Sequence, residues 1–139
     1  MKILLILLTV SLIIITNSCL FDVDDSGISG TYFYTAYDST GIIVAKGQIE
    51  LNFRDSTKIS GEWNIQQVGN SDNIGPQIGM GKLEGFYAQN ELVIELNPHN
   101  VDNNLQLIGE HKNSYLRGNW FYISFIGITN QGTFEAEKK

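Results

Sequence analysis

Apolar and polar side chains alternate residue by residue in several stretches of this chain, and this period of two constrains the fold more than any other feature. In the first stretch, Ile49, Leu51 and Phe53 share one face while polar residues occupy the other. The same alternation recurs in residues 59–66 and 91–96. Alternation with a period of two is typical of a β-strand that buries one face.

Weaker alternation predicts five further strands, in residues 30–37, 77–87, 104–109, 115–125 and 129–136. Residues that favour turns separate the stretches, at 38–41, 54–56, 89–90, 97–100, 111–113 and Gly127. Only residues 69–76 suggest a longer loop. Turns this short reverse an antiparallel strand, so strands that follow each other in sequence are neighbours in space. Beyond residue 19 no stretch keeps the 3.6-residue period of a helix, so we predict an all-β domain.

A glycine followed two residues later by an aromatic residue recurs in five of these stretches. The pairs are Gly30/Tyr32, Gly61/Trp63, Gly85/Tyr87, Gly118/Trp120 and Gly132/Phe134. Both members lie on one face of a strand, where the glycine permits bending and the ring fills the core. Because closure removes the free edges of a sheet, we predict an up-and-down barrel of about eight antiparallel strands. A β-sandwich of two packed sheets is the alternative.

In strand count, length and Gly-x-aromatic pattern, residues 28–137 resemble the calycin-type barrels, which include avidin-like and lipocalin-like proteins. The lipocalin's opening Gly-x-Trp is replaced here by Gly30-Thr31-Tyr32, and no ligand-binding residue is carried over. The resemblance implies a calycin-like barrel, and a barrel of eight strands either fills with its own side chains or holds one small ligand. The aromatic residues expected to line such a cavity or to fill the core are Tyr32, Trp63, Tyr87, Trp120 and Phe134.

The N-terminus has the layout of a signal peptide. Lys2 supplies a positive charge, an apolar run follows from Ile3 to Ile15, and three small or polar residues precede Cys19. A helix that spans a membrane needs about 20 apolar residues, so this run is short for an uncleaved anchor, which is the alternative.

Ser18-Cys19 resembles the core of the lipobox of bacterial lipoproteins, in which a small residue precedes a cysteine that is diacylated and then exposed by a peptidase. Thr16 stands where the usual leucine would be, a relaxed form similar to the lipoboxes of Bacteroidetes-type bacteria. The resemblance implies cleavage between Ser18 and Cys19 and a diacylglycerol cysteine that carries palmitate-type chains. Cys19 is the single cysteine of the chain and has no disulfide partner within it.

Three segments are therefore expected. Residues 1–18 form the cleaved signal helix, residues 19–28 form the lipidated cysteine with an acidic tether, and residues 29–137 form the barrel. Leu20 is not the aspartate that signals retention at the inner membrane in enteric bacteria. By this resemblance we expect a lipid-anchored protein of the cell envelope, with the outer membrane favoured, that faces the periplasm or the surface.

The charge balance argues against nucleic acid as a partner. The formal net charge is −6, and it becomes about −7 once Lys2 leaves with the signal peptide, whereas a phosphate-binding surface is basic. Residues 22–27 resemble the opening of a calcium loop, but Phe33 stands at the closing position, where a carboxylate is needed. His99 and His111 fall in predicted turns without ligand spacing. We expect no metal and no other cofactor.

No catalytic group is singled out. The serines lack a Gly-x-Ser-x-Gly turn, so no nucleophile is indicated. The glutamates that could form a carboxylate pair across strands are Glu50, Glu62, Glu84, Glu91, Glu95 and Glu110. Most of them alternate with core residues and are expected outside the barrel. The chain is therefore not expected to be an enzyme.

Two functions remain open. The first is a membrane-anchored binding protein that holds a small apolar or amphipathic ligand in the barrel or presents its loops to a protein partner. The second is a structural or protease-inhibitor-like envelope lipoprotein with a packed core that acts through its surface loops. The volume inside the barrel distinguishes a ligand carrier from a packed protein, because a ligand needs a cavity of about 300 Å³ or more.

Overall fold

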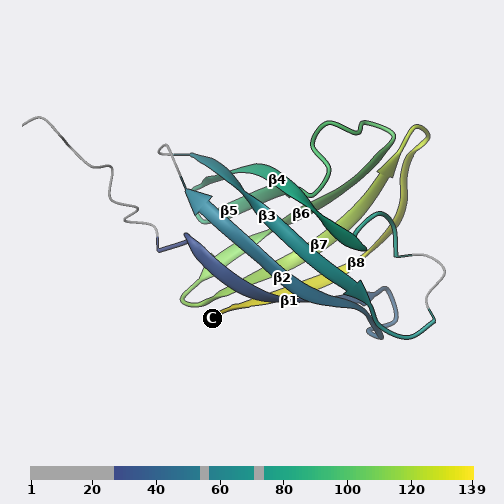
Figure 1. Ribbon diagram of the computed structural model, residues 1–139, viewed down its shortest axis with the longest axis horizontal. Helices are drawn as coiled ribbons and strands as arrows, with labels where there is room; N and C mark the ends of the chain where they lie inside the picture. Colours follow the sequence, from purple (N-terminus) through teal and green to yellow (C-terminus); the bar gives the residue numbers. More distant parts are fainter. Residues whose placement is uncertain (1–26, 54–56, 71–73) are drawn as a thin grey trace, which may run out of the picture.

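The computed structural model describes residues 27–53, 57–70 and 74–139, which form eight β-strands in one closed sheet (Figure 1). The strands are β1 (Gly30–Asp38), β2 (Ile43–Phe53), β3 (Lys58–Gln67), β4 (Gly79–Ala88), β5 (Glu91–Glu95), β6 (Asn103–Lys112), β7 (Tyr115–Ser124) and β8 (Gly127–Lys138). Each strand pairs antiparallel with the next, and β8 pairs with β1. The predicted eight-stranded up-and-down barrel is confirmed, and the sandwich alternative is wrong because a sandwich leaves its two sheets separate.

Three strands are at least four residues longer than the sequence pattern predicts: β2, β6 and β8, whose range also takes in the predicted turn at Gly127. β2 begins at Ile43 rather than at residue 48. The register with β1 shifts between Ala36 and Tyr37, and Val44 and Ala45 are both buried, so the alternation is interrupted there. A β-bulge interrupts the alternation of apolar and polar residues, so this part of the strand cannot be recognised from a period of two.

β6 runs on through His111, which the sequence pattern places in a surface turn. His111 pairs with Leu116 of β7, and the turn comes at Asn113, whose φ of 57° lies in the left-handed region. The His111 ring packs edge-on against Tyr87, with 6.1 Å between the ring centroids. The prediction of a surface turn is therefore wrong for His111, which is half-buried on a strand.

Inward-facing side chains fill the barrel. Alternate residues of each strand point inward, and the largest of the fully buried side chains are Trp120, Tyr32, Tyr34 and Phe134. The rings of Tyr34 and Phe134 stack with 5.9 Å between their centroids. Aliphatic side chains from all eight strands complete the core.

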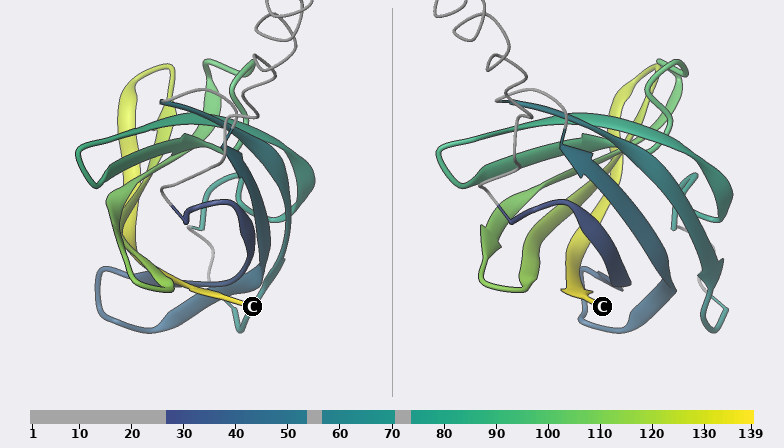
Figure 2. Two further views of the ribbon diagram at one scale, coloured as in Figure 1. Left: turned by 90° about the vertical axis from the view of Figure 1, so that its left-hand side faces the viewer. Right: turned by 60° about the vertical axis from the view of Figure 1, so that its left-hand side comes forward.

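Segments of chain cover both ends of the barrel. At the end where the described chain begins, Ile28 is fully buried, and its carbonyl accepts a hydrogen bond of 2.6 Å from the Tyr32 hydroxyl. The purple segment leading into β1 lies inside the ring of strands in the left view of Figure 2. At the opposite end, Ile74 and Gln77 of the β3–β4 loop are buried in the same core. Ile28 and the Ile74–Gln77 segment thus act as plugs.

Close approach of neighbouring backbones accounts for two of the glycines. A Cβ at Gly61 would overlap the Glu50 carbonyl. A Cβ at Gly132 would overlap the Tyr37 carbonyl and would lie 2.7 Å from Nε1 of Trp120. The missing side chain leaves room both for the adjacent strand and for an aromatic ring, as the Gly-x-aromatic pattern indicates.

Successive loops alternate between the two ends of an up-and-down barrel. We call the end that holds residues 27–29, the β4–β5 and β6–β7 turns and the C-terminus the near end. The far end holds the β1–β2, β3–β4, β5–β6 and β7–β8 loops and lies on the right in Figure 1. Across the described ranges, no helix has the length and apolar character needed to cross a membrane.

Candidate functional site

The five aromatic residues singled out from the sequence all lie in the core. Tyr32 and Trp120 have no exposed surface, and Phe134 is 1% exposed. Trp63 is 5% exposed and Tyr87 is 9% exposed. A void that admitted a water molecule would expose the side chains around it, so no such space lies beside Tyr32 or Trp120.

The polar tips of these rings bond to the protein itself. Nε1 of Trp63 donates to the Leu96 carbonyl at 2.7 Å, and Nε1 of Trp120 donates to the Tyr37 carbonyl at 2.8 Å. The Tyr87 hydroxyl donates to Oδ1 of Asn90 at 2.9 Å. Because each of these donors is already used, none of the three is free to donate a hydrogen bond to an enclosed ligand.

A buried polar pair lies at the far end of the barrel, and the sequence pattern does not indicate it. The Tyr34 hydroxyl donates to Oε1 of Gln77 at 2.9 Å, and Nε2 of Gln77 donates to the Ile74 carbonyl at 2.7 Å. Burial raises the pKa of Tyr34 well above its usual value. A lone Gln77 at the edge of a predicted strand carries no sign of burial, since its partner is 43 residues away in the sequence.

Several predicted features fall outside the described residues. These are the cleavage site between Ser18 and Cys19, the lipidated Cys19 itself, and the acidic residues 22–25. The structure begins its description at Gly27, immediately before the near end of the barrel.

Ionisable side chains gather on the outer face of the barrel rather than in a cleft. Within the described ranges, no three or more His, Cys, Asp or Glu side chains converge in a way that could hold a metal ion. His99 lies on the surface with Nε2 3.8 Å from a carboxylate oxygen of Glu84, and its side chain is 87% exposed. An ion pair this exposed contributes little to stability.

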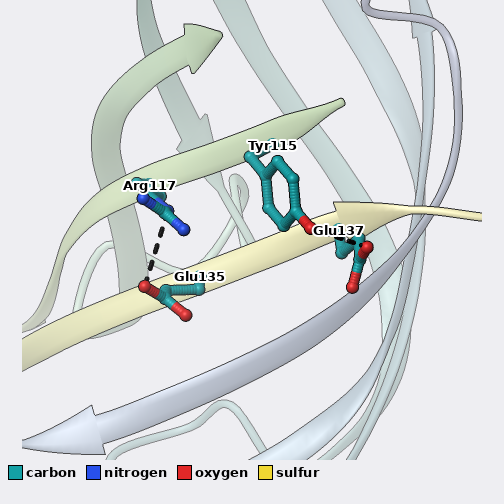
Figure 3. A network of polar contacts seen from close by, with 4 residues as sticks. All are labelled: Tyr115, Arg117, Glu135 and Glu137. Carbon is teal, nitrogen blue, oxygen red and sulfur yellow. Dashed lines mark hydrogen bonds and ion pairs between the residues drawn. The ribbon is translucent and has the colours of Figure 1, made fainter. Parts of the chain in front are cut away.

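A polar network covers the outer face of β7 and β8 beside the near end of the barrel (Figure 3). Nε of Arg117 lies 3.4 Å from Oε1 of Glu135, and the guanidinium stands 5.1 Å from the centre of the Tyr115 ring. The Tyr115 hydroxyl donates to Oε1 of Glu137 at 2.7 Å. The hydrogen bond to the Glu137 carboxylate raises the pKa of Tyr115, and the negative charge of that carboxylate raises it further. The network is exposed to solvent, and its contacts join β7 to β8 across the outer face of the barrel.

Exposed apolar side chains gather at the far end. Phe125 and Ile126 form the tip of the β7–β8 hairpin and are 87% and 85% exposed, and Ile128 follows them. Val101 of the β5–β6 loop is also exposed, and it lies close to the tip because Asn103 pairs with Ser124. We call these four residues, Val101, Phe125, Ile126 and Ile128, the apolar tip.

Grooves are present on the outer face of the sheet. One of about 700 Å³ crosses β3 to β6 and is lined by Thr57, Lys58, Ile59, Ser60, Glu84, Gly85, Phe86, Val93, Glu95 and Gln106. Another of about 520 Å³ crosses β1 to β4 and includes Glu50, Glu62 and Lys82. We call the first the β3–β6 groove and the second the β1–β4 groove. Both lie outside the filled core, so a molecule held in either would touch the outer surface.

Comparisons of the chain with protein-family models, with curated proteins and with solved structures find no match. A functional proposal therefore depends on the chain's own residues and on the shape of its barrel.

Proposed function

We propose that this chain is an exported, non-enzymatic lipoprotein of the cell envelope that binds a protein partner through the outer surface of its barrel. Cys19 carries the lipid, and the outer membrane is the favoured location. The single observation that carries the binding mode is the filled interior with a plug at each end. A small ligand in the barrel would need a cavity of about 300 Å³, together with a mouth through which to enter.

The anchor and the barrel geometry are compatible. Two acyl chains hold a protein stably on a bilayer, since each buried methylene contributes about 0.8 kcal/mol. The tether joins the barrel at its near end, because the described chain begins at Gly27 beside β1. The apolar tip and the other far-end loops lie at the opposite end from this attachment, where a partner can reach them.

Native mass spectrometry tests the binding mode. The lipid-bearing protein is purified from its host in a mild detergent, and any small molecule that copurifies is released and weighed. We expect the mass of the lipidated chain with no stoichiometric passenger. A passenger in one-to-one ratio, lost when Trp120 or Phe134 is changed, would overturn surface binding in favour of a ligand carrier.

Metabolic labelling tests the anchor. Cells that produce the full chain are fed an alkynyl palmitate, and the label is read on the protein after gel separation. We expect labelling of the native chain and of Ser18→Ala, because alanine is also a small residue before the cysteine. Cys19→Ala should lose the label and leave the membrane fraction. A label that survives Cys19→Ala would contradict anchoring at this residue.

A further inference from the structure

The outward side of β4, β5 and β6 carries a row of apolar side chains across the strands. Phe86 of β4 faces Val93 of β5, and Val93 faces Ile108 of β6. Phe86 is 53% exposed, and Val93 and Ile108 are half-buried. Outward positions on a barrel in water are usually polar, so three neighbouring apolar residues form an unusual strip, which we call the apolar row.

A pair of carboxylates borders the apolar row on each side. Glu84 faces Glu95 across β4 and β5, and Glu91 faces Glu110 across β5 and β6. Each pair is two residues along the strand from the apolar row, a distance of about 7 Å. Like charges that face each other directly across two strands destabilise a sheet. The stability of the sheet therefore does not account for two such pairs beside one apolar row.

Within the described ranges, lysine and arginine side chains form no ion pair with these four carboxylates. Among the described residues, no ion pair within 4.0 Å reaches Glu95 or Glu91, and Glu84 has only the exposed His99. Lys58 lines the β3–β6 groove at the β3 end of the apolar row and forms no salt bridge with Glu84 or Glu95.

Arg117 of β7 stands opposite Glu110 in the ladder, but it forms its ion pair with Glu135. A third facing pair, Glu50 and Glu62, likewise has a cation opposite one member, because Lys82 stands opposite Glu62 on the next strand. Of the three facing pairs, Glu84 and Glu95 are therefore the one with no lysine or arginine directly opposite either member, which leaves them for a cation supplied from outside.

We propose that the β3–β6 groove and the apolar row bind a basic, amphipathic peptide segment of the partner protein. This inference rests on the proposed function, because it names the surface and the chemistry of the partner. Apolar side chains of the segment would cover Phe86, Val93 and Ile108. Lysine or arginine side chains would extend to the carboxylates on either side, where long basic side chains bury their stems and keep their charge near water.

Charge and shape together favour this occupant. The carboxylates repel nucleic acid and other anionic partners. They attract a basic segment, whose association rate should fall as the salt concentration rises. An exposed aromatic ring beside the carboxylates adds a cation–π contact for an arginine or lysine. A groove of about 700 Å³ has room for several side chains of such a segment.

The test is a peptide titration on the full chain, purified in a non-ionic detergent, read by fluorescence anisotropy of the peptide. The probe is a synthetic peptide of about 14 leucine and lysine residues with its leucines at helical spacing. A second peptide, with glutamate in place of lysine, is the probe's control.

Four variants locate the binding. Glu84→Gln with Glu95→Gln removes one carboxylate pair at the apolar row. Glu50→Gln with Glu62→Gln removes the same charge from the matched pair beside the β1–β4 groove. Phe86→Ser removes the exposed ring, and Phe86→Leu keeps an apolar side chain there. Circular dichroism checks that each variant keeps its sheet.

We expect the lysine peptide to bind and the glutamate peptide not to bind. Affinity should fall about 10-fold or more in Glu84→Gln/Glu95→Gln and in Phe86→Ser, and less than about 2-fold in Glu50→Gln/Glu62→Gln and Phe86→Leu. Equal losses in both carboxylate variants would mean general attraction to an acidic protein and would overturn the groove. Absence of binding by the native chain would overturn it as well.

The two proposals fail in different measurements. Loss of the groove would appear in the peptide titration, while palmitate labelling and the empty native mass stay as expected. Failure of the anchor or of the filled interior would appear in those two measurements, whatever the peptide does.

Discussion

Trp120 shows how single residues close the interior of this barrel. Its ring has no exposed surface, and its one donor is bonded to the Tyr37 carbonyl, 83 residues away in the sequence. The ring also occupies the space that a side chain at Gly132 would need. Burial of a large ring with a satisfied polar tip combines apolar area with a hydrogen bond, so this position should contribute strongly to stability.

Replacing Trp120 with phenylalanine tests this role. Trp120→Phe removes the donor to a buried carbonyl and part of a buried ring, so we expect the free energy of unfolding to fall by about 2–4 kcal/mol. Urea denaturation of the full chain in detergent measures the change. Tyr115→Phe, which removes the exposed hydrogen bond to Glu137, is the control and should cost under about 0.5 kcal/mol. Similar losses in both variants would contradict a stabilising role specific to Trp120.

Tyr34 makes the stability of the barrel sensitive to alkaline pH. Burial raises its pKa in the folded protein above the value of about 10 expected in the unfolded chain. The neutral hydroxyl is therefore favoured by folding, and this contribution is fully present below pH 10 and is lost as the pH rises further. The loss can reach about 1.4 kcal/mol per pH unit for one such group.

Tyr34→Phe isolates this effect. Urea midpoints are measured at about pH 8 and about pH 11 for the native chain and the variant. We expect the native chain to lose more stability over this interval than Tyr34→Phe, which has no hydroxyl to ionise. At pH 8 the variant should be weaker by about 1–2 kcal/mol, because Oε1 of Gln77 loses its donor. Equal alkaline losses would mean that Tyr34 does not control the response.

At the scale of the elements, two far-end loops have opposite roles. The β3–β4 loop turns Ile74 and Gln77 into the barrel, and Nδ2 of Asn97 also donates to the Pro76 carbonyl at 3.2 Å. The β7–β8 hairpin turns Phe125 and Ile126 outward. Gly127, with a φ of 105°, supplies the left-handed residue after the tip, so the turn itself does not need two large apolar residues.

Variants of the two loops should separate a structural role from a surface role. Ile74→Ala removes a buried plug and should cost about 2–4 kcal/mol of unfolding free energy. Phe125→Ser with Ile126→Asn should change stability by less than about 0.5 kcal/mol, because both side chains are in solvent. The tip variant should also bind less of a hydrophobic dye than the native chain. Destabilisation by the tip variant as large as that of Ile74→Ala would show that the tip packs against the barrel.

At the scale of the whole molecule, closure brings the ends of the barrel chain together. β1 and β8 pair from Tyr32 with Lys138 to Asp38 with Gly132. The amide of Lys139 donates to the Thr31 carbonyl at 2.8 Å, and Nζ of Lys138 donates to the Gly27 carbonyl. The barrel chain therefore begins and ends at the near end, beside the tether.

A circular permutant tests this arrangement. Residue 139 is joined to residue 27 by a short glycine linker, and new ends are opened between Gln89 and Asn90 in the exposed β4–β5 turn. We expect a folded barrel with one cooperative unfolding transition, because termini that lie close together permit permutation. Circular dichroism and urea denaturation provide the measurement. A second permutant, with its new ends between Ser39 and Thr40, serves as the control. If both permutants failed to fold, the closeness of the two ends would be contradicted.

The amino-acid sequence by itself determined the strands, since alternation is a local property: eight strands are where the pattern predicts them, with ends that differ by a few residues. It also placed Trp63, Trp120 and Phe134 on apolar faces beside their glycines. It could not show that β6 continues through His111, because pairing with Leu116 outweighs a local turn signal.

Only the tertiary structure decided what lies inside and outside the closed sheet. Tyr34 meets Gln77, and Glu84 meets Glu95, through pairings between segments that are separate in the sequence. A period of two assigns a residue to a face but does not state whether the space behind that face is filled. Packing of side chains from all eight strands and from the two plugs fills that space, and the same closure sets the apolar row between its carboxylate pairs.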